Sequence, residues 1–211
     1  IRDSYKGGFD CVAIYLRNNP ESRFFSKKGL ILGGSHSPSP LNSEAHQGDL
    51  SAVLLQNLNP LVNLIRIPKK PIILMDEWES KIKAIVENTW NKDVNSLSGV
   101  PSWMLVLIKA VLKKTGKEYL TDVWPNLEVF FHGGISFEPY REQYKTLIPS
   151  NKMHYMETYN ASEGFFGLQD DPADPSLLMM PDYGIFYEFI PMDEIDRETP
   201  NVVPLLSLIH I

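Results

Sequence analysis

The sequence predicts an α/β fold, in which a partly parallel sheet with flanking helices is followed after residue 165 by an extension of short strands. From residue 94 to residue 158 the apolar pattern alternates as strand, helix, strand, helix, strand. After residue 165 it changes to short strands with no helices between them. With 43% hydrophobic and 22% charged residues, the 211-residue chain has enough apolar side chains for a packed core.

The first third of the chain has the least regular pattern. Residues 29–33 (Gly-Leu-Ile-Leu-Gly) predict a short buried strand, and the glycine-, serine- and proline-rich residues 33–40 predict the loop that leaves it. We interpret these residues as a connecting loop, because a phosphate-binding loop also needs a lysine and a strongly patterned helix after it. Residues 42–58 predict a helix with loose periodicity.

A clearer helix begins near residue 76. Asp76 is the expected N-cap, with Glu79 three residues later as in a capping box. Ser80 falls on a charged face of this helix. The buried stripe has the spacing of a single helix face and consists of Trp78, Ile82, Ile85, Val86 and Thr89.

A short strand over residues 94–97 precedes a second helix. Pro101 suits the first turn of that helix, because no N–H donor is needed there, and Gly116 ends it. The apolar positions of the helix are Met104, Leu105, Ile108, Val111 and Leu112.

Residues 127–132 predict a buried strand that runs directly into two glycines. Ser136 is then the expected cap of a third helix, which continues to Leu147 and is stopped by Pro149. Residues 153–158 form the next predicted strand. The later short strands are expected in a mixed or antiparallel arrangement over residues 165–168, 177–180 and 185–190.

The three strands between residues 94 and 158 form two successive β-α-β units, whose crossovers make neighbouring strands parallel. Their carboxyl ends should therefore meet at one edge of the sheet, and open α/β sheets bind ligands outside that edge. The segments brought together there are residues 99–101, 133–135 and 159–163.

The residue types at this edge suit a nucleotide. The ring of Tyr159 offers a flat face to a purine, and the hydroxyl of Ser162 can donate to a phosphate oxygen. The carboxylate of Glu163 supplies hard oxygen ligands for a Mg²⁺ that bridges phosphates. Gly133 and Gly134 lack side chains, so their backbone can lie against a ligand.

Each of these residues also has a purely structural interpretation. Two glycines after a strand are most often a tight turn, and a Ser-Glu pair can cap the segment that follows it. A single tyrosine is more often a core aromatic than a platform for a base. Only the joint position of these residues at neighbouring strand ends favours a ligand site.

Composition argues against several classes of protein. A formal net charge of -6 and a pI near 5.4 argue against a nucleic-acid-binding surface. No apolar run is long enough to cross a bilayer, and no signal peptide is visible, so we expect no membrane association. Cys11 is the single cysteine, which excludes an internal disulfide framework and predicts a cytoplasmic protein. The five histidines show no paired metal spacing, so no zinc site is expected.

Two motifs carry a family resemblance. Residues 131–136 (Phe-His-Gly-Gly-Ile-Ser) followed by residues 159–163 (Tyr-Asn-Ala-Ser-Glu) resemble the auxin-responsive acyl-acid amido synthetases, the Gretchen Hagen family of plants with bacterial relatives. The second ATP motif of that family, Tyr-x-x-Ser-Glu, is matched here by Tyr159, Ser162 and Glu163. Residues 97–103 resemble the segment beside the family's acyl pocket. The resemblance extends to about residue 204 and is to a bacterial-type member.

The resemblance implies the large N-terminal domain of an adenylate-forming enzyme, the group that includes luciferase. It also implies a ligase that works in two steps with ATP and Mg²⁺. A carboxylic acid attacks the α-phosphate of ATP, giving an acyl-adenylate and pyrophosphate. An amine, usually an amino acid, then displaces AMP to form an amide.

The resemblance further implies roles for single residues. Glu163 would hold Mg²⁺ and Ser162 would contact phosphate, which makes these two the expected catalytic residues. The adenine would be framed by Tyr159, Asn160, Gly133, Gly134, Ile135 and Ser136. The acyl group would contact Val100, Pro101, Trp103 and Phe137.

Residues 1–211 are expected to form an incomplete large domain that binds ATP and the acyl group. By the family pattern, the phosphate loop would lie before residue 1, and the ribose-binding aspartate and the small C-terminal lid domain would lie after residue 211. The chain alone is therefore expected to be inactive. Two alternatives stay open: a non-catalytic nucleotide-binding or interaction module, and a relative that forms an acyl-CoA thioester.

Overall fold

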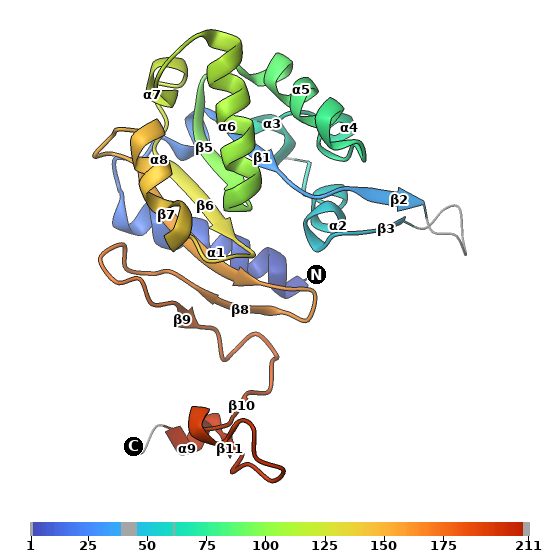
Figure 1. Cartoon of the computed structure of the whole chain (residues 1–211), viewed down its shortest axis with the longest axis vertical. Coiled ribbons are helices and arrows are strands. Elements are labelled where there is room, and N and C mark those ends of the chain that lie inside the picture. The colour runs from blue at the N-terminus through green and yellow to red at the C-terminus, as the bar shows by residue number, and fades with distance from the viewer. Residues whose placement is uncertain (1, 39–45, 61, 209–211) are drawn as a thin grey trace.

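A computed structural model describes residues 2–38, 46–60 and 62–208 of the chain. Its centre is a seven-stranded sheet (Figure 1). In spatial order the strands are β4 (Arg66–Ile67), β1 (Lys28–Leu32), β5 (Val94–Gly99), β6 (Val129–Gly133), β7 (His154–Asn160), β8 (Phe165–Leu168) and β9 (Leu178–Met179). The first five are parallel to their neighbours, whereas β8 and β9 pair antiparallel. The predicted fold class, with its extension after residue 165, is confirmed.

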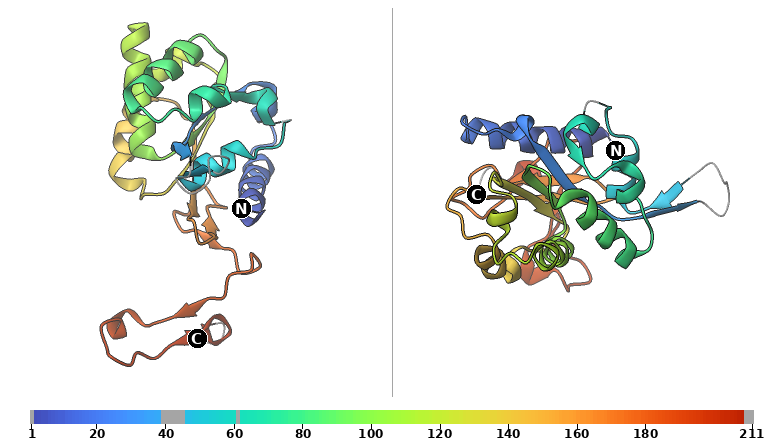
Figure 2. Two further views of the ribbon diagram at one scale, coloured as in Figure 1. Left: turned by 90° about the vertical axis from the view of Figure 1, so that its right-hand side faces the viewer. Right: turned by 90° about the horizontal axis from the view of Figure 1, so that it is seen from above.

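Helices cover both faces of this sheet (Figure 2). One face carries α1 (Arg2–Asn18), and the other carries α5 (Trp78–Thr89), α6 (Pro101–Thr115) and α8 (Arg141–Leu147). The shorter helices are α2 (Leu50–Gln56), α3 (Val62–Ile65), α4 (Lys70–Ile73), α7 (Leu120–Val123) and α9 (Leu205–Leu208), and the 3-10 turns are η1 (Phe24–Ser26), η2 (Glu138–Tyr140) and η3 (Met192–Glu194). Two further strand pairs lie outside the main sheet, β2 (His36–Pro38) with β3 (His46–Gly48) and β10 (Glu188–Phe189) with β11 (Val203–Pro204).

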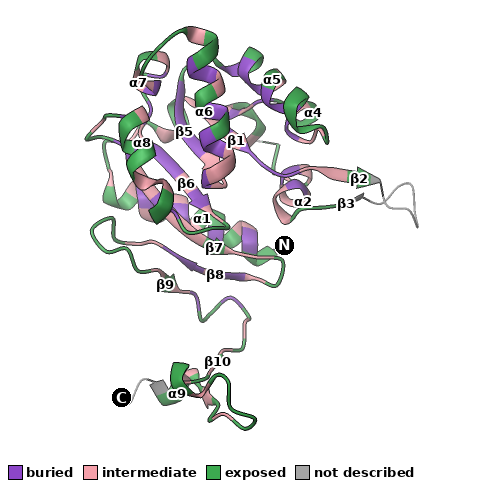
Figure 3. Ribbon diagram, viewed as in Figure 1, coloured by how far each residue is buried: buried purple, intermediate pink, exposed green. Residues whose placement is uncertain are grey.

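The alternation of side chains along each strand divides the core into two clusters. On β6, Phe130 packs into the larger cluster with α5, α6 and α8, whereas Val129 and Phe131 pack with α1. In Figure 3 the faces of α5 and α6 that turn toward the sheet are buried and the opposite faces are exposed. The sheet is therefore covered on both sides, which leaves its strand-end edges for function.

Helix α6 follows the prediction closely. It begins at Pro101 with Val100 as N-cap, and it ends at Gly116, whose φ of 66° is the left-handed conformation that glycine adopts most easily. Met104, Ile108 and Val111 on its inner face are fully buried. Burying each such side chain contributes roughly 1.5–3 kcal/mol, so this helix fixes the position of its own first turn beside the sheet edge.

Helix α5 differs from the prediction at its start. The capping side chain is Glu77 rather than Asp76, because the helix begins one residue later than expected. The Glu77 carboxylate accepts hydrogen bonds from the backbone N–H groups of Glu79 at 2.9 Å and Ser80 at 2.6 Å. Trp78 is exposed rather than part of the buried stripe, whereas Lys81, beside Ser80 on the expected charged face, is buried.

The segment after β1 also differs from the prediction. Within residues 33–40, predicted as a plain loop, His36–Pro38 form β2, which pairs with β3 in a hairpin, and residues 39–40 of that prediction lie outside the described residues. The helix predicted over residues 42–58 is shorter, because β3 ends at Gly48 and α2 covers only Leu50–Gln56. Residues 42–45 of that prediction lie outside the described residues. Each of the strands β2 and β3 depends on pairing with the other, which propensity along one strand does not reveal.

Two further corrections concern β6, β7 and the helix between them. Ser136 caps no helix: it is exposed, the chain first forms η2 with Pro139 in its first turn, and α8 starts only at Arg141. Strand β7 continues to Asn160, two residues beyond the predicted end, because β8 pairs with its last residues. The structure also adds the 17-residue helix α1, which the irregular first third does not predict.

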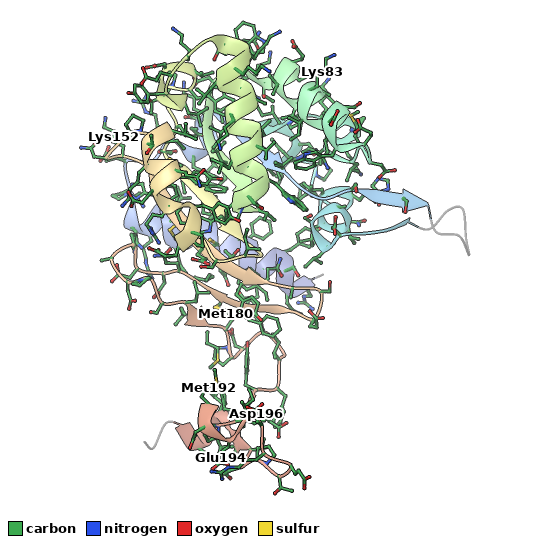
Figure 4. The ribbon with its side chains drawn as sticks, in the orientation of Figure 1. Lys83, Lys152, Met180, Met192, Glu194 and Asp196 are labelled. Carbon is green, nitrogen blue, oxygen red and sulfur yellow. The ribbon has the colours of Figure 1, made fainter. Side chains whose placement is uncertain are left out.

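The last part of the chain leaves the body of the molecule. Tyr183 and Asp182 are tied to α1 by a hydrogen bond to Asp10 and an ion pair with Lys6. Beyond Gly184 the chain extends into an arm that carries β10, β11 and α9. Figure 4 shows Met192, Glu194 and Asp196 on this arm, away from the sheet. Within the part of the chain that the structure describes, no helix combines the length and apolarity needed to span a bilayer.

Candidate functional site

The carboxyl ends of four parallel strands lie side by side at one edge of the sheet. In register, Leu32 at the end of β1 pairs with Gly99 of β5, Gly99 pairs with His132 of β6, and His132 pairs with Glu157 of β7. The structure thus brings together the segments 99–101, 133–135 and 159–163 that the sequence places at a common edge. We call this the strand-end edge.

The double glycine at the end of β6 is required by close backbone contact. A Cβ atom on Gly133 would lie 2.2 Å from the carbonyl oxygen of Thr158 on β7, so no side chain fits there. Gly134 has a φ of 83°, in the left-handed region, and its Cβ position is 3.5 Å from Cγ2 of Val100. The turn therefore lies next to both neighbouring segments, β7 and Val100. Ile135 and Ser136, which follow it, are exposed at the edge.

Ser162 and Glu163 form the tip of the β7–β8 hairpin. The backbone N–H of Ala161 donates to the carbonyl oxygen of Gly164 at 2.9 Å, and the N–H of Gly164 donates back to Ala161 at 3.2 Å. These two bonds close a two-residue tip, and both side chains on it are exposed to solvent. A hydroxyl and a carboxylate are thus held at the strand-end edge by paired strands on both sides.

Tyr159 and Asn160 lie within β7 just before this tip. The Tyr159 side chain is 55% exposed, and its ring leans on Phe166 with the ring centroids 4.9 Å apart. Phe166 supports one side of the ring, and enough surface is left open for a planar ligand to stack on it. The side-chain oxygen of Asn160, Oδ1, is buried and accepts no hydrogen bond from the described residues.

The residues expected to contact an acyl group lie on the other side of the Gly133–Gly134 turn. Trp103 is half-buried and packs edge-on against Trp78, with ring centroids 5.6 Å apart. Pro101 is buried, and its carbonyl oxygen accepts a 2.8 Å hydrogen bond from the hydroxyl of Tyr144. Phe137 is also buried, so it contributes to a wall beneath the surface rather than to the surface itself.

A polar layer lies directly below the double glycine on the α6 and α8 face of the sheet. His132 is only 2% exposed, and burial, reinforced by the positive charge of Arg141, lowers the pKa of its imidazole to about 3. Glu157 is half-buried beside it; burial raises the pKa of its carboxyl, and Arg141 and the Phe137 backbone N–H partly offset this. Period-two alternation from Phe130 would have placed His132 on this face.

Lys81 is a second residue whose position the sequence did not indicate. Its side chain is buried, and Nζ donates to the carbonyl oxygens of Gly33 at 2.7 Å and Gly34 at 2.9 Å. Burial lowers the pKa of this amine, and the negative charges of Asp49 and Asp76 act in the opposite direction. Lys81 therefore holds Gly33 and Gly34, the segment that leaves β1, against α5. Strand β1 adjoins β5 at the strand-end edge.

The metal-binding capacity of the edge is limited. Among the described residues there is no cluster of three or more His, Cys, Asp or Glu side chains that could hold a metal ion. Mg²⁺ keeps several waters and usually takes one or two carboxylates together with substrate phosphates. The exposed carboxylate of Glu163 is an oxygen ligand of the kind that Mg²⁺ accepts.

Two surface hollows lie elsewhere, at the opposite edge of the sheet. One is lined by Ser22 and Phe25 before β1, and the other by Asp93 and Asn126, which precede β5 and β6. Neither includes a residue of the strand-end edge. The candidate site therefore consists of the residues that meet at the carboxyl ends of the strands.

Comparison with known proteins gives a family and a fold. The profile described as "GH3 family N-terminal domain" matches residues 2–153, which includes the double glycine and ends just before β7. A solved structure of a GH3.15 acyl acid amido synthetase is similar with a TM-score of 0.64 at 15% sequence identity, covering 97% of this chain and 48% of that chain. The chain thus spans about half the length of this solved relative. No curated protein matches the chain significantly.

Proposed function

The chain belongs to the GH3 family, and from this premise we propose that its strand-end edge binds ATP and a carboxylic acid during formation of an acyl-adenylate, which then reacts with an amine. The observation that carries the proposal is the position of the Gly133–Gly134 turn, which lies next to both β7 and Val100. This position supports nucleotide and acyl candidates that share one edge. The activity belongs to the intact protein that contains these residues.

Each side chain at the edge has a role that suits its position. The open side of Tyr159 can stack on the adenine, and Asn160 Oδ1 can accept a hydrogen bond from the adenine amino group. Ile135 and Ser136 lie beside the same turn and complete the adenine side. Ser162 can donate its hydroxyl proton to a phosphate oxygen.

Glu163 is proposed to hold the Mg²⁺ that accompanies ATP. A bound Mg²⁺ neutralises charge that builds up on the phosphate oxygens as pyrophosphate leaves. The backbone hydrogen bonds of the hairpin hold the main chain that carries Glu163 at the strand-end edge. The chain supplies positioning and charge, and the acid supplies the nucleophile.

The test is acid-dependent exchange of labelled pyrophosphate into ATP by the intact protein. Glu163→Gln removes the charge but keeps the side-chain volume, and we expect exchange to fall on the order of a hundredfold or more. Glu118→Gln, an exposed glutamate at the other end of the molecule, is the matched control and should retain exchange. Near-normal exchange in Glu163→Gln would remove this residue from the site.

The same assay separates the proposal from its alternatives. A non-catalytic nucleotide-binding module would bind ATP without exchanging pyrophosphate for any acid. A thioester-forming relative would exchange pyrophosphate but release AMP only when coenzyme A is supplied. The amide-forming reaction predicts AMP release on addition of an amino acid or another amine.

A further inference from the structure

Beneath the double glycine lie buried polar atoms that the fold leaves unpaired. Both ring nitrogens of His132 and the hydroxyl oxygen of Tyr155 are buried and make no hydrogen bond with the described residues. A buried polar group without a partner costs about 1–3 kcal/mol. Three such atoms in one cluster are costly unless another molecule pairs with them.

The two side chains share one aromatic neighbour. Phe137 stacks on the imidazole of His132, with ring centroids 4.2 Å apart, and on the ring of Tyr155, with centroids 4.9 Å apart. Stacking covers the faces of these rings, whereas their hydrogen-bonding atoms lie at the ring edges. The unpaired atoms are therefore not blocked by Phe137, and Phe130 and Tyr144 complete the aromatic surroundings.

The cluster adjoins the residues proposed for the acyl group. Phe137 belongs to both sets, and the Tyr144 hydroxyl reaches the carbonyl oxygen of Pro101. On the β5 side, the register partner of His132 is Gly99, which directly precedes Val100. Val100 and Pro101 therefore follow the β5 residue that pairs with His132, which places the acyl candidates next to the strand that carries the cluster.

The electrostatics of the cluster favour an uncharged ligand group. Burial lowers the pKa of His132 to about 3 and raises the pKa of Tyr155 to about 12, so both are neutral at physiological pH. The positive charge of Arg141 acts on both His132 and Tyr155 and disfavours a cation, and Glu157, the register partner of His132 on β7, disfavours an anion. A neutral imidazole has one donor and one acceptor, and a tyrosine hydroxyl has one of each, which suits a hydroxyl group.

We propose that His132 and Tyr155 form a recognition pair for an uncharged hydroxyl group on the ring-bearing body of the carboxylic acid substrate. The pair determines specificity and takes no part in bond formation. This inference rests on the proposed function, because it concerns the acid that the strand-end edge activates.

The experiment compares matched acids in the intact protein. The probes are 3-phenylpropionic acid and its ortho-, meta- and para-hydroxylated forms, each tested for acid-dependent ATP–pyrophosphate exchange. One good hydrogen bond is worth about tenfold, so the best hydroxylated acid should exceed the unsubstituted acid by roughly that factor in kcat/KM. Tyr155→Phe, which removes one oxygen and keeps the ring, should bring this ratio close to one.

His132→Phe should reduce the same ratio, and the control Tyr119→Phe, at the opposite edge of the sheet, should leave it unchanged. If His132→Phe does not fold, Tyr155→Phe alone decides. A ratio that is near one in the unmodified protein, or that Tyr155→Phe does not change, overturns the inference. The inference is also overturned if none of the four phenylpropionic acids supports exchange while other carboxylic acids do. If no acid supports exchange, it is the proposed function that fails.

Discussion

At the scale of single residues, the strand-end edge depends most on a position that has no side chain. Gly133 brings the end of β6 against the backbone of β7, and the carbonyl oxygen of Thr158 occupies the place where a Cβ atom would stand. Because that neighbour is backbone in a paired strand, it cannot move aside without breaking the pairing of β6 with β7. The closeness of the two halves of the site is thus determined by main-chain geometry.

This predicts a large effect of the smallest substitution. Gly133→Ala should destabilise the fold by about 1–3 kcal/mol, the usual cost of overpacking, and should also reduce ATP binding. Gly8→Ala is the matched control, since a Cβ atom on that helical glycine meets nothing within 4 Å and should be neutral or slightly stabilising. Urea unfolding of both variants measures the difference. Equal stabilities would contradict the contact described here.

At the scale of elements, α8 is joined to the first turn of α6 by a buried hydrogen bond. The hydroxyl of Tyr144 donates to the carbonyl oxygen of Pro101 at 2.8 Å, and the Tyr144 ring is fully buried. Burial also raises the pKa of this hydroxyl, which keeps it protonated as a donor. The bond holds the Pro101 segment against the aromatic cluster below the strand-end edge.

Tyr144→Phe should therefore destabilise the protein by about 1–2 kcal/mol, because the Pro101 carbonyl loses its side-chain partner. Tyr187→Phe serves as comparison. Its hydroxyl makes a longer bond of 3.4 Å to Met180 in a more exposed place, so its loss should cost less than about 0.5 kcal/mol. Chemical denaturation at neutral pH measures both. A larger effect at Tyr187 than at Tyr144 would be inconsistent with this role.

The elements also show what could be predicted from sequence. Strong local signals located α6, with its proline at the start and glycine at the end, and the three parallel strands beside it. Features that depend on pairing with another strand were missed or displaced. The last residues of β7 are in a strand because β8 pairs with them, and the β2–β3 hairpin exists only as a pair.

Helix α1 was missed for a related reason. Its buried residues Ser4, Gly7, Cys11 and Tyr15 have helical spacing but little apolar character. The ring of Phe165 lies so close to α1 that it occupies the place of a Cβ atom on Gly7, so close packing requires a glycine inside this helix. The sequence predicted which segments come together at the candidate site. It could not predict the unpaired atoms of His132 and Tyr155, because whether a buried atom has a hydrogen-bond partner depends on its three-dimensional surroundings. The individual roles of the site residues stay predictions.

At the scale of the whole molecule, the neutral buried imidazole of His132 makes stability depend on pH. In the unfolded chain this histidine takes up a proton near its ordinary pKa of 6.5, whereas in the folded protein it does so only near 3. Between these values the unfolded state binds more protons, so stability falls as pH falls. The raised pKa of Glu157 acts in the opposite direction above the ordinary pKa of a glutamate.

We expect the free energy of unfolding to decrease on going from pH 7 to pH 5, with His132 contributing about 2 kcal/mol of the decrease. In His132→Gln this contribution should be absent, so the difference between the two pH values should shrink by that amount. Because the other titrating groups are unchanged, the difference between the two proteins gives the contribution of His132 to the pH dependence of stability. An unchanged pH dependence would show that His132 is solvated in the folded state.

The body of the molecule and the arm beyond Gly184 differ in how their side chains are packed. Tyr183 and Asp182 fix the chain to α1, but Phe186, Met192 and Leu206 beyond Gly184 are largely exposed. The family profile ends at residue 153, whereas similarity to the solved structure continues through almost the whole chain. The structural match thus covers more of the chain than the family profile does.

The buried amine of Lys81 can report how often this part of the structure opens. Amine-reactive reagents reach Nζ only when Gly33 and Gly34 part from α5, whereas Lys83, two residues along the same helix, is open to them at all times. The rate at which Lys81 becomes labelled, relative to Lys83, therefore reports how often the segment after β1 lifts away. Slower labelling on addition of ATP or an acid would register occupancy of the neighbouring edge without any measurement of turnover.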